Sequence, residues 1–491
     1  MQREAGQPKQ TNLLYLWGMV FSYFSVNAIA LLAVSGTADK DQAEQLILSQ
    51  AFQLGYSSKP PLYTYIVKAL FYVTGPGLAP LLVLKAILLS LFAGSIITLG
   101  RQFRFTTHQH LVALASLVFI PQIIWESQRD LTHSVLVTTI AAATLLQFVR
   151  IRRSPTTLNY VALGALAGLG LISKYNYAMF LTALLLAAAA VPQYRSVLSN
   201  RGILAALPVA LLISTPHMFW LLSNLELATG SVSKLHIGDG NFAAGLASAA
   251  VAALAFLTPL LVFALFLIPS PVKGSLHEKI RHVDSRLLLN LLIATLIVVA
   301  VFVMASGAQQ IKDRWYQPLL FYVPLIIAML ATPTRAGLKW YLGLGAVFAV
   351  IVSLALPGRT TFAAFLDKFS RPNIPYPELL ASMAHLNRKP GFVLAETNVL
   401  GGNSRPVFPD AVIQVPSYSV DSGSLSGDGF VVCETPDCDN ARFRKWLGSN
   451  YALDAQLLKF NRIEMPYRYA PSERKSIYFS RVHLPQSASH K

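Results

Sequence analysis

Long apolar runs recur along the first three quarters of the chain and are separated by short polar stretches. Each run approaches the roughly 20 residues that an α-helix needs to cross the hydrocarbon core of a membrane. Eleven runs fit this description: Leu13–Val34, Leu78–Leu99, Leu111–Trp125, His133–Val149, Leu158–Leu171, Tyr177–Val191, Ile203–Leu222, Phe242–Ile268, Leu287–Ser306, Trp315–Ala331 and Trp340–Leu356. The pattern predicts a polytopic, mostly α-helical membrane protein with about eleven transmembrane helices.

The polar stretches between these runs form two alternating sets. One set is rich in arginine and lysine, as in residues 150–153 and 279–286, whereas the other is richer in acids and aromatics, as in residues 39–59 and 126–132. Arginine and lysine accumulate in the cytoplasmic loops of membrane proteins. We therefore expect the first set and the N-terminus on the cytoplasmic side. The second set and the C-terminal region then lie on the external side.

Two stretches of the first external loop have helical character without the length of a span. Gln42–Gln53 carries a short apolar centre between glutamines, and Pro60–Gly75 begins with two prolines and contains Lys68. Proline pushes the residue before it into extended geometry, so a helix should end before Pro60. We expect both stretches to lie as helices along the external membrane surface.

The composition changes after Leu356, where proline, glycine, serine and charged residues become frequent. The short apolar stretches GFVLAE, AVIQVPSYSV, GFVVCE and SIYFSRVHL are typical of strands, and Pro377–Asn387 and Ala441–Leu447 of helices. We expect a transmembrane domain of residues 1–356, with its first external loop at 35–77. It is followed by a small external α/β domain of residues 357–491.

The two cysteines of the chain, Cys433 and Cys438, both lie in this C-terminal region. Their spacing is not that of a CxxC motif, and there is no second pair with which to complete a zinc site. A disulfide is expected if the region lies outside the cytoplasm, and two free thiols are the alternative.

Composition and charge agree with a membrane protein. Only 13% of the residues are charged and the mean hydropathy is +0.50, whereas soluble domains carry about 25% charged residues. The net charge of +17 is not arranged as a basic stripe with interleaved aromatics, so no nucleic-acid partner is expected. The positive charge is expected to face the anionic headgroups of membrane lipids.

The first external loop carries acidic residues where the apolar pattern breaks. Asp41 and Glu44 are three residues apart and share a face of a helix. A carboxylate just outside a membrane can act as a general base on a hydroxyl group; a helix N-terminal acid that stabilises the dipole is the alternative. Asp39, one turn earlier, is expected to cap the helix. Tyr56 and Tyr63 in the same loop are candidate substrate-binding residues.

Basic residues fall at external helix ends, Arg129 among them. Lys59 directly precedes the Pro-Pro step, and Lys174 and Arg314 lie in later external loops. Several cations on one side suit a ligand that carries phosphate, although side chains that anchor in lipid headgroups are the alternative. Tyr175, next to Lys174, is a further candidate for substrate binding.

A second acidic group follows the third apolar run. Glu126, Asp130 and His133 are spaced so that they can share a helical face. One histidine and two acids are a weak metal signal, so a divalent metal is possible but not indicated, and no cofactor is expected. An acid–base or acceptor-binding role and plain hydrogen bonding are the alternatives.

No Walker loop, dinucleotide fingerprint, HExxH or GxSxG motif is present. An enzyme that works outside the cytoplasm cannot use a cytosolic nucleotide donor. An activated lipid is the natural alternative.

The run DQAEQLILSQAFQLGYSSKPPLYTYI, from Asp41 to Ile66, resembles the first external loop of bacterial GT-C glycosyltransferases. These are related to protein O-mannosyltransferases and to the aminoarabinose transferase of lipid A. GLGLISKYNYAMFL (168–181) and DRWYQPLLFYVP (313–324) are similar to two further segments of that family. The resemblance covers most of the chain in order.

This resemblance implies that Asp41 is the catalytic base and that Lys59, with Lys174 and Arg314, holds the donor phosphate. It implies a single displacement with inversion, in which a polyprenyl phosphate leaves. The family's second acid is not in its usual place, because Leu131-Thr132-His133-Ser134 stands where the family often has Thr-Asp-Ala and Gln42 stands in place of a glutamate. Glu44, Asp130 and His133 remain the candidates for that role.

The prediction is therefore a glycosyltransferase of a bacterial inner membrane, with polyprenyl-phosphate-linked sugar as donor. The acceptor is expected to be a periplasmic glycolipid or glycan, with lipopolysaccharide or lipid A preferred. A transporter or flippase of lipid-linked sugar and a protein O-glycosyltransferase are the alternatives. Transporters commonly show internal repeats, and none is evident here.

Overall fold

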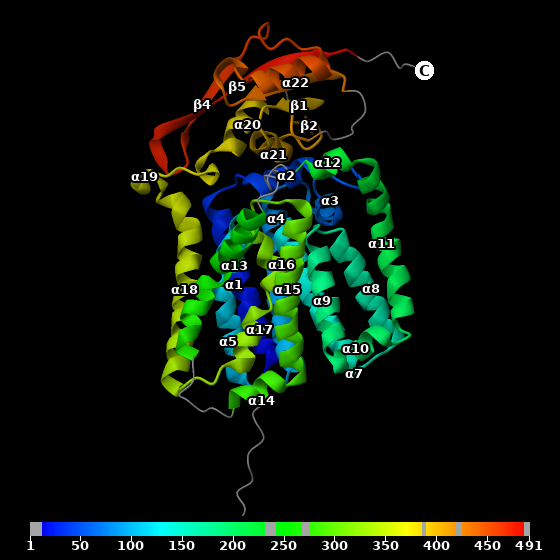
Figure 1. Ribbon diagram of the computed structural model, residues 1–491. Coiled ribbons are helices and arrows are strands. Elements are labelled where there is room, and N and C mark those ends of the chain that lie inside the picture. Colours follow the sequence, from blue (N-terminus) through cyan, green and yellow to red (C-terminus); the bar gives the residue numbers. More distant parts are fainter. Residues whose placement is uncertain (1–11, 231–241, 268–274, 385–388, 419–424, 486–491) are drawn as a thin grey trace, which may run out of the picture.

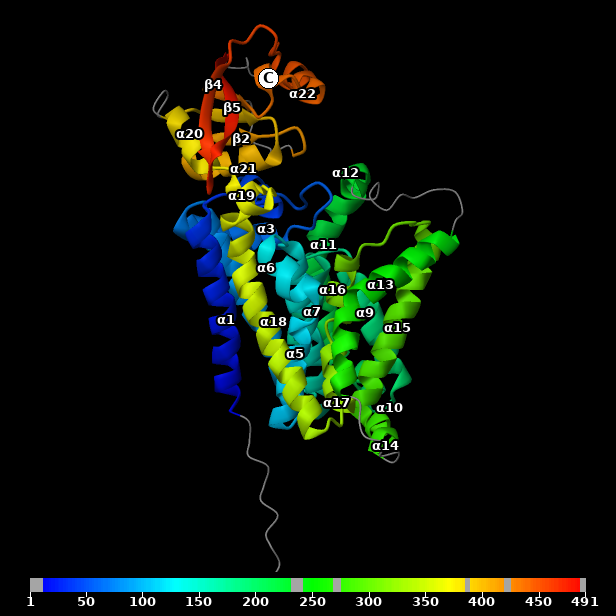
Figure 2. The same cartoon turned by 90° about the vertical axis from the view of Figure 1, so that its left-hand side faces the viewer.

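A helical bundle carries a smaller mixed domain on one end in the computed structural model (Figure 1). The structure describes residues 12–230, 242–267, 275–384, 389–418 and 425–485. Both Figure 1 and Figure 2 place the C-terminal domain beyond the same end of the bundle, which we call the domain-bearing end.

The first half of the bundle consists of long helices joined by shorter ones. They are α1 (Leu13–Val34), α2 (Lys40–Leu48), α3 (Leu62–Thr74), α4 (Leu78–Gln102), α5 (Thr107–Val118), the π-helix η1 (Gln122–Glu126), α6 (Ser127–Arg129), α7 (His133–Arg153), α8 (Thr157–Leu171), α9 (Tyr177–Ala190), α10 (Pro192–Ser199) and α11 (Ile203–Ser223).

The second half of the bundle has the same mixture of long and short elements. Its elements are α12 (Leu225–Thr229), α13 (Phe242–Ala264), η3 (Leu265–Leu267), α14 (Ser275–Arg281), α15 (Val283–Ser306), η4 (Asp313–Tyr316), α16 (Gln317–Leu320), α17 (Val323–Leu330), α18 (Arg335–Thr361) and α19 (Ala363–Leu366).

Seven of the described helices are long and apolar enough to cross a membrane, and up to nine spans result if two bent helix pairs each count as one. The eleven predicted segments all contain helix, but not all are continuous. Residues 315–331 are divided among η4, α16 and α17, and α8 has only 15 residues. Proline residues at 318 and 324 begin new helices there, because proline is favoured in a first turn and not in a helix interior.

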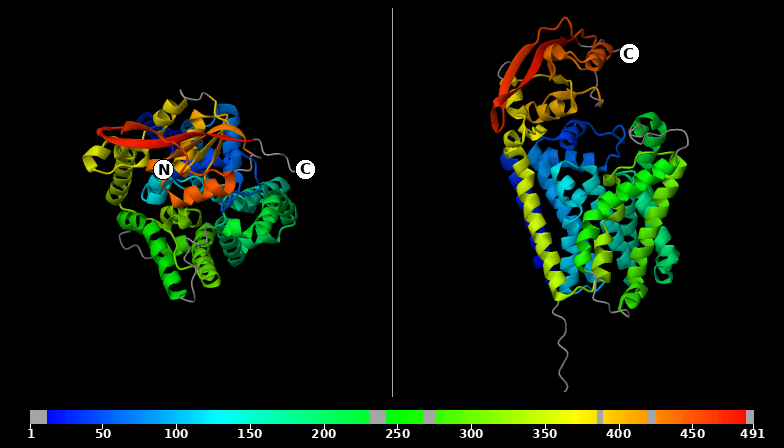
Figure 3. Two further views of the ribbon diagram at one scale, coloured as in Figure 1. Left: turned by 90° about the horizontal axis from the view of Figure 1, so that it is seen from above. Right: turned by 60° about the vertical axis from the view of Figure 1, so that its left-hand side comes forward.

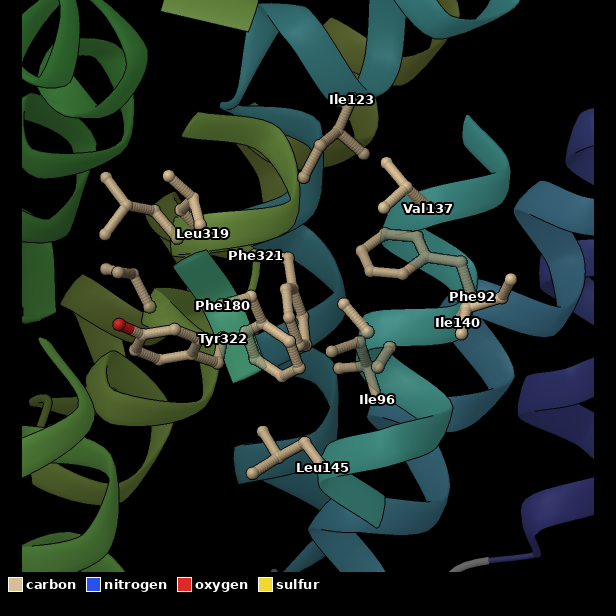
Figure 4. Close-up of a cluster of buried hydrophobic side chains, with 14 of the residues drawn as sticks. Phe92, Ile96, Ile123, Val137, Ile140, Leu145, Phe180, Leu319, Phe321 and Tyr322 are labelled. Carbon is tan, nitrogen blue, oxygen red and sulfur yellow. The ribbon is translucent and has the colours of Figure 1, made fainter. Parts of the chain in front are cut away.

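Aromatic and aliphatic side chains from several helices fill the centre of the bundle. Phe321 lies 6.1 Å from Phe92 and 5.7 Å from Phe180 between ring centroids. Figure 4 shows these rings pointing toward one another, with Leu145 and Ile96 beside them. Edge-to-face and tilted ring contacts of this kind add to the stabilisation by burial.

The C-terminal domain contains a five-stranded sheet in the order β2-β1-β3-β5-β4. Its strands and helices are α20 (Tyr376–Ala384), β1 (Phe392–Ala395), α21 (Asn398–Val407), β2 (Val412–Gln414), β3 (Gly427–Cys433), α22 (Ala441–Tyr451), β4 (Asn461–Tyr467) and β5 (Ala470–Leu484), with short 3-10 turns η5 (Arg371–Asn373) and η6 (Pro436–Cys438). Strand β1 pairs in parallel with β2 and β3, and β5 pairs antiparallel with β3 and β4.

The predicted mixed α/β composition of this domain is confirmed, as are the four predicted strands. Strand β4, which contains Arg462, Glu464 and Pro466, was not predicted. Proline in a sheet is confined to edge strands, and β4 is an edge strand. Cys433 and Cys438 are joined by a disulfide.

The C-terminal domain packs directly on the first loop of the bundle. A Cβ atom at Gly402 of α21 would collide with the backbone of Ala43 in α2. Asn403 adds two hydrogen bonds to the backbone of Ala38, at 2.8 and 3.1 Å. Seen from above in Figure 3, the domain covers the blue N-terminal elements, while green helices extend to the side.

This packing corrects the prediction for residues 42–53. Every residue of α2 from Gln42 to Leu48 is buried, so the helix lies between the bundle and α21 and not along a lipid surface. Helix α3 is the more exposed of the two, with Tyr72 94% and Val73 83% exposed at its end.

Candidate active site

The predicted loop residues converge at the domain-bearing end, beneath the C-terminal domain. Helix α2 begins with a capping box in which Asp39 accepts from the backbone N–H of Lys40, at 2.9 Å, and Gln42 bonds back to Asp39. The Asp39 carboxylate also pairs with Arg371 at 2.9 Å and with Arg359 at 3.7 Å. The predicted capping role of Asp39 is confirmed, and its pairing fixes the start of α2.

Asp41 lies in the first turn of α2 and faces Asp130 from the segment between α6 and α7. The backbone N–H of Asp41 donates to Asp130 Oδ1 at 2.9 Å. The Asp41 carboxylate itself makes no hydrogen bond or ion pair with any residue that the structure describes. Asp41 is therefore held through its backbone, and its carboxylate remains open to a ligand.

The environment of Asp130 favours its neutral form. Burial, together with the charges of Asp41 and Asp39, raises the pKa of Asp130 to about 6. Lys85, in α4, is the nearby cation that opposes this effect. Two carboxylates in close proximity resist simultaneous ionisation, so they titrate as a pair.

Lys85 was not identified from the sequence, although it lies inside an apolar run. Its side chain is buried, with 3% exposed, and its ammonium has no hydrogen-bond partner among the described residues. A lysine inside a membrane helix is costly, which makes Lys85 a candidate functional residue. That single charge in an otherwise apolar segment was the available signal.

Glu44 lies one turn after Asp41 on the same face of α2, as its spacing predicts. It forms an ion pair with Lys59, and the hydroxyl of Tyr418 from the C-terminal domain lies against it. Burial would lower the pKa of Lys59, but Glu44, Asp41 and Asp130 outweigh it and the pKa is raised. Lys59 is therefore charged and already has one acidic partner.

Tyr418 reaches the site from a position about 370 residues away in the chain. Burial and the Glu44 carboxylate raise the pKa of Tyr418, which keeps the phenol protonated as a hydrogen-bond donor. No local pattern around Tyr418 indicated this placement, because it depends on how the C-terminal domain packs on α2.

Lys174 projects from the turn between α8 and α9 and donates to Ser134 Oγ at 2.7 Å. Burial and the neighbouring charge of Arg314 lower the pKa of Lys174 to about 7. Both residues lie at the domain-bearing end, as predicted. A cation without an acidic partner and next to another cation is destabilised until an anion binds.

His133 serves as a buried structural contact in this arrangement. Its ring hydrogen-bonds with Gln45 at 3.1 Å and lies 3.4 Å from the carbonyl oxygen of Ser173. Gln45 in turn accepts from Thr64 at 3.0 Å. Both ring nitrogens are occupied, so Asp130 is better placed than His133 to act with Asp41.

The remaining predicted residues form two groups, those with an unpartnered hydroxyl group and those that bond to the protein itself. The hydroxyl groups of Tyr63 and Tyr175 are buried and have no hydrogen-bond partner among the described residues, and Tyr63 interacts electrostatically with Asp41. Tyr56 instead closes its own loop, donating to Ala51 O at 2.7 Å. Glu126 pairs with Arg129 at 2.7 Å. Tyr56 and Glu126 thus have internal partners.

Buried polar atoms without partners cost about 1–3 kcal/mol each. Tyr63, Lys85 and Thr132 carry such atoms, which a bound ligand would be able to satisfy. Across the described ranges, no group of three or more His, Cys, Asp and Glu side chains could hold a metal.

Comparison with known proteins identifies relatives of this arrangement. Residues 58–220 match the family described as dolichyl-phosphate-mannose-protein mannosyltransferase. The chain is 32% identical over 431 residues to the lipopolysaccharide core galacturonosyltransferase RgtB of Rhizobium johnstonii, covering 84% of this chain and 85% of that protein. It is 29% identical to RgtA of the same organism, covering 82% of each.

The fold is similar to a solved membrane protein. The crystal structure of ArnT from Cupriavidus metallidurans bound to undecaprenyl phosphate matches with a TM-score of 0.61 and 12% identity. The match covers 96% of this chain and 98% of that one. The apo form of the same protein matches with a TM-score of 0.57.

The fold and these relatives together define a multi-pass membrane glycosyltransferase of the GT-C type. The chain belongs to the family of the lipopolysaccharide core galacturonosyltransferases. The predictions of fold class and of a glycosyltransferase are confirmed, and the transporter alternative is not supported.

Proposed function

We propose that this enzyme transfers galacturonic acid from a polyprenyl-phosphate carrier to the core oligosaccharide of lipopolysaccharide. The names of RgtA and RgtB support the sugar and the acceptor, and the undecaprenyl phosphate bound by ArnT supports the carrier. The observation that carries the proposal is the open carboxylate of Asp41, beside Asp130 and among the cations Lys59 and Lys174.

In the proposed reaction, the Asp41 carboxylate accepts the proton of an acceptor hydroxyl group. The hydroxyl oxygen attacks the anomeric carbon from the face opposite the phosphate. The new glycosidic bond forms as the bond between the anomeric carbon and the phosphate oxygen breaks, and the configuration inverts. Polyprenyl phosphate leaves with the bonding electrons, and Asp41 carries the proton until it is released to solvent.

Lys174 and Arg314 are the groups best suited to the donor phosphate, because neither has an acidic partner among the described contacts to its side chain. A bound phosphate would attract both cations, which offsets their mutual repulsion. It would also raise the pKa of Lys174. Lys59 would contribute as well, but it is shared with Glu44. Its full charge would become available only if the donor displaced Glu44.

The proposed orientation places the domain-bearing end in the periplasm of an inner membrane. The opposite end carries the arginine-rich loops, including Arg152 and Arg153 at the end of α7, as expected for cytoplasmic loops. The disulfide between Cys433 and Cys438 suits an oxidising compartment.

The direct test is transfer by the purified full-length chain in detergent. Radiolabelled galacturonic acid on polyprenyl phosphate is offered with lipopolysaccharide that has a truncated core, with lipid A alone, and with a protein acceptor. Label should enter the core. Label only in lipid A or in protein would overturn the acceptor, and turnover only with another sugar would overturn the galacturonic acid assignment.

A further inference from the structure

A cavity of about 440 Å³ opens where the first loop of the bundle meets the C-terminal domain. It is lined from the bundle side by Gln50, Phe52, Gln53 and Lys68, and from the domain side by Arg405 and Asp410. None of these residues belongs to the group around Asp41. The cavity lies at the far end of α2 from that group.

The walls of the cavity are held together across the domain boundary. Gln50 pairs with the backbone of Ile413 in β2 through two hydrogen bonds, at 2.8 and 3.0 Å. The Gln50 side chain also donates to Ile47 O at 2.8 Å. This bridging keeps the two walls at a fixed separation, so the cavity is formed before a ligand arrives.

The charge of the cavity is positive. Lys68 donates to the carbonyl oxygens of Ser49 and Gln50, at 3.3 and 2.8 Å, and Arg405 donates to those of Pro409 and Ala411. Carbonyl groups satisfy the hydrogen bonds of a cation but do not cancel its charge.

Asp410 is the carboxylate among the described residues that line the cavity, and it is exposed. A single exposed carboxylate leaves the two cations only partly balanced. The cavity therefore favours an anionic ligand.

An aromatic surface adjoins these charges. Phe52 is 65% exposed, and one face of its ring stacks on Tyr65, with centroids 4.4 Å apart and planes 13° from parallel. The Tyr65 hydroxyl donates to Gln53 O at 2.7 Å, which fixes the support. A rigid exposed ring beside amide and charged groups suits a sugar, which has apolar C–H faces and a polar rim.

We propose that this cavity binds the acceptor oligosaccharide, at sugar units that carry carboxylate or phosphate groups. Gln50 follows Asp41 by nine positions, mostly of helix α2, which corresponds to about 13.5 Å at 1.5 Å per residue. An oligosaccharide can span this distance, with its acidic part in the cavity and the reacting hydroxyl at Asp41. The proposal rests on the proposed function for the identity of the acceptor.

Binding is measured without catalysis. Core oligosaccharide released from lipopolysaccharide by mild acid is titrated into the full-length protein in detergent by calorimetry. Phe52→Ala should weaken binding about tenfold, which corresponds to roughly 1.4 kcal/mol. The matched control is Phe362→Ala, since Phe362 is 64% exposed at the end of α18 and should leave binding unchanged. An unchanged Kd in Phe52→Ala would overturn the site.

The charge of the ligand is tested separately. Asp410→Asn removes the opposing carboxylate and should strengthen binding about threefold at low salt, an effect of the size expected for exposed charges. Carboxyl-reduced and dephosphorylated oligosaccharide should bind more weakly than the untreated form. Equal binding of both forms, unaffected by Asp410→Asn, would overturn the acidic-sugar assignment.

Two further outcomes separate this proposal from the proposed function. In a transfer assay, Phe52→Ala should raise the KM for the acceptor and not that for the donor; a change confined to the donor would overturn the proposal. Saccharide binding that depends on Phe52, without any transfer, would support the cavity and refute the function.

Discussion

The bundle has a notable carboxylate at each end, Asp284 at one and Asp41 at the other. The two differ in how many of the surrounding groups bond to them. At the end away from the C-terminal domain, Asp284 is buried, with 1% exposed, and has several donors and cations around it. It accepts from Tyr194 at 2.6 Å and from Arg152 at 3.1 Å, with Arg153 and His282 each 3.9 Å away.

At the domain-bearing end, Asp41 has only its backbone N–H engaged, by Asp130. A carboxylate that is buried against bonded donors and cations is committed to the fold, because any other use of it would break those contacts. A carboxylate that the fold positions without bonding its oxygens can take a proton from a substrate. The difference in partners, and not burial or charge alone, separates the structural acid from the candidate base.

The sharpest test of this contrast is Asp41→Asn. The amide keeps the backbone contact to Asp130 but cannot accept a proton, so transfer should fall by about 10²–10⁴-fold, the range for loss of a general base. Turnover of lipid-linked sugar in detergent measures the effect. The thermal unfolding temperature should stay close to that of the wild type, and turnover like the wild type would exclude Asp41 as the base.

Asp284→Asn should give the reverse pattern. The amide leaves Arg152 without its counter-charge in a buried position, which destabilises by about 3 kcal/mol. The unfolding temperature in detergent should fall clearly, while kcat of the folded protein stays unchanged. A loss of kcat at unchanged unfolding temperature would mean that the two carboxylates do not differ as argued.

The pH dependence of transfer sharpens the role of Asp130. Its pKa is raised to about 6, and a protonated Asp130 could donate to the open Asp41 carboxylate and block the base. The ratio kcat/KM should therefore fall below pH 6 by about tenfold per pH unit. Asp130→Asn should remove this inflection and lower the plateau; an identical profile in both proteins would contradict the assignment.

The titration of Asp130 also changes the stability of the fold with pH. The direction of that change distinguishes a loss of activity from unfolding. As pH rises, the folded protein keeps the Asp130 proton until about pH 6. The unfolded chain, in which Asp130 has its ordinary pKa of 3.8, loses the proton at a lower pH. Protonation therefore favours the folded state as pH falls from above 6 toward 4. A loss of activity near pH 6 cannot then come from the titration of Asp130 unfolding the protein.

Much of this site was predictable from the sequence, because its parts lie in recognisable loops. The motif around Asp41 and Lys59 and the acidic cluster containing Asp130 come from segments with strong local patterns. Alternation of the apolar runs places those loops at one end of the bundle, and this required no knowledge of side-chain packing.

The missed parts depend on tertiary contacts or on a weak signal. Tyr418 and the pairing of Asp39 with Arg371 follow from docking of the C-terminal domain, which Gly402 permits by close backbone approach. The burial of α2 was missed for the same reason. Its glutamines resemble a polar surface in the sequence, whereas the bonds of Asn403 and Gln50 join the segments flanking α2 to the domain only in the folded structure. Hydrophobic patterning does not report contacts between polar groups far apart in the chain.

The smallest expected effect tests whether the C-terminal domain takes part in the site. Tyr418→Phe removes one hydroxyl beside Glu44 and keeps the ring, so a loss of one hydrogen bond should lower kcat/KM by about 2–10-fold. The loss should come mainly from a changed KM for the donor, because Glu44 then binds Lys59 without competition. Tyr451→Phe, in α22 of the same domain, is the matched control. Equal kinetics for Tyr418→Phe and the wild type would mean that the Tyr418 hydroxyl takes no part in transfer. The C-terminal domain would then only hold α2 in place.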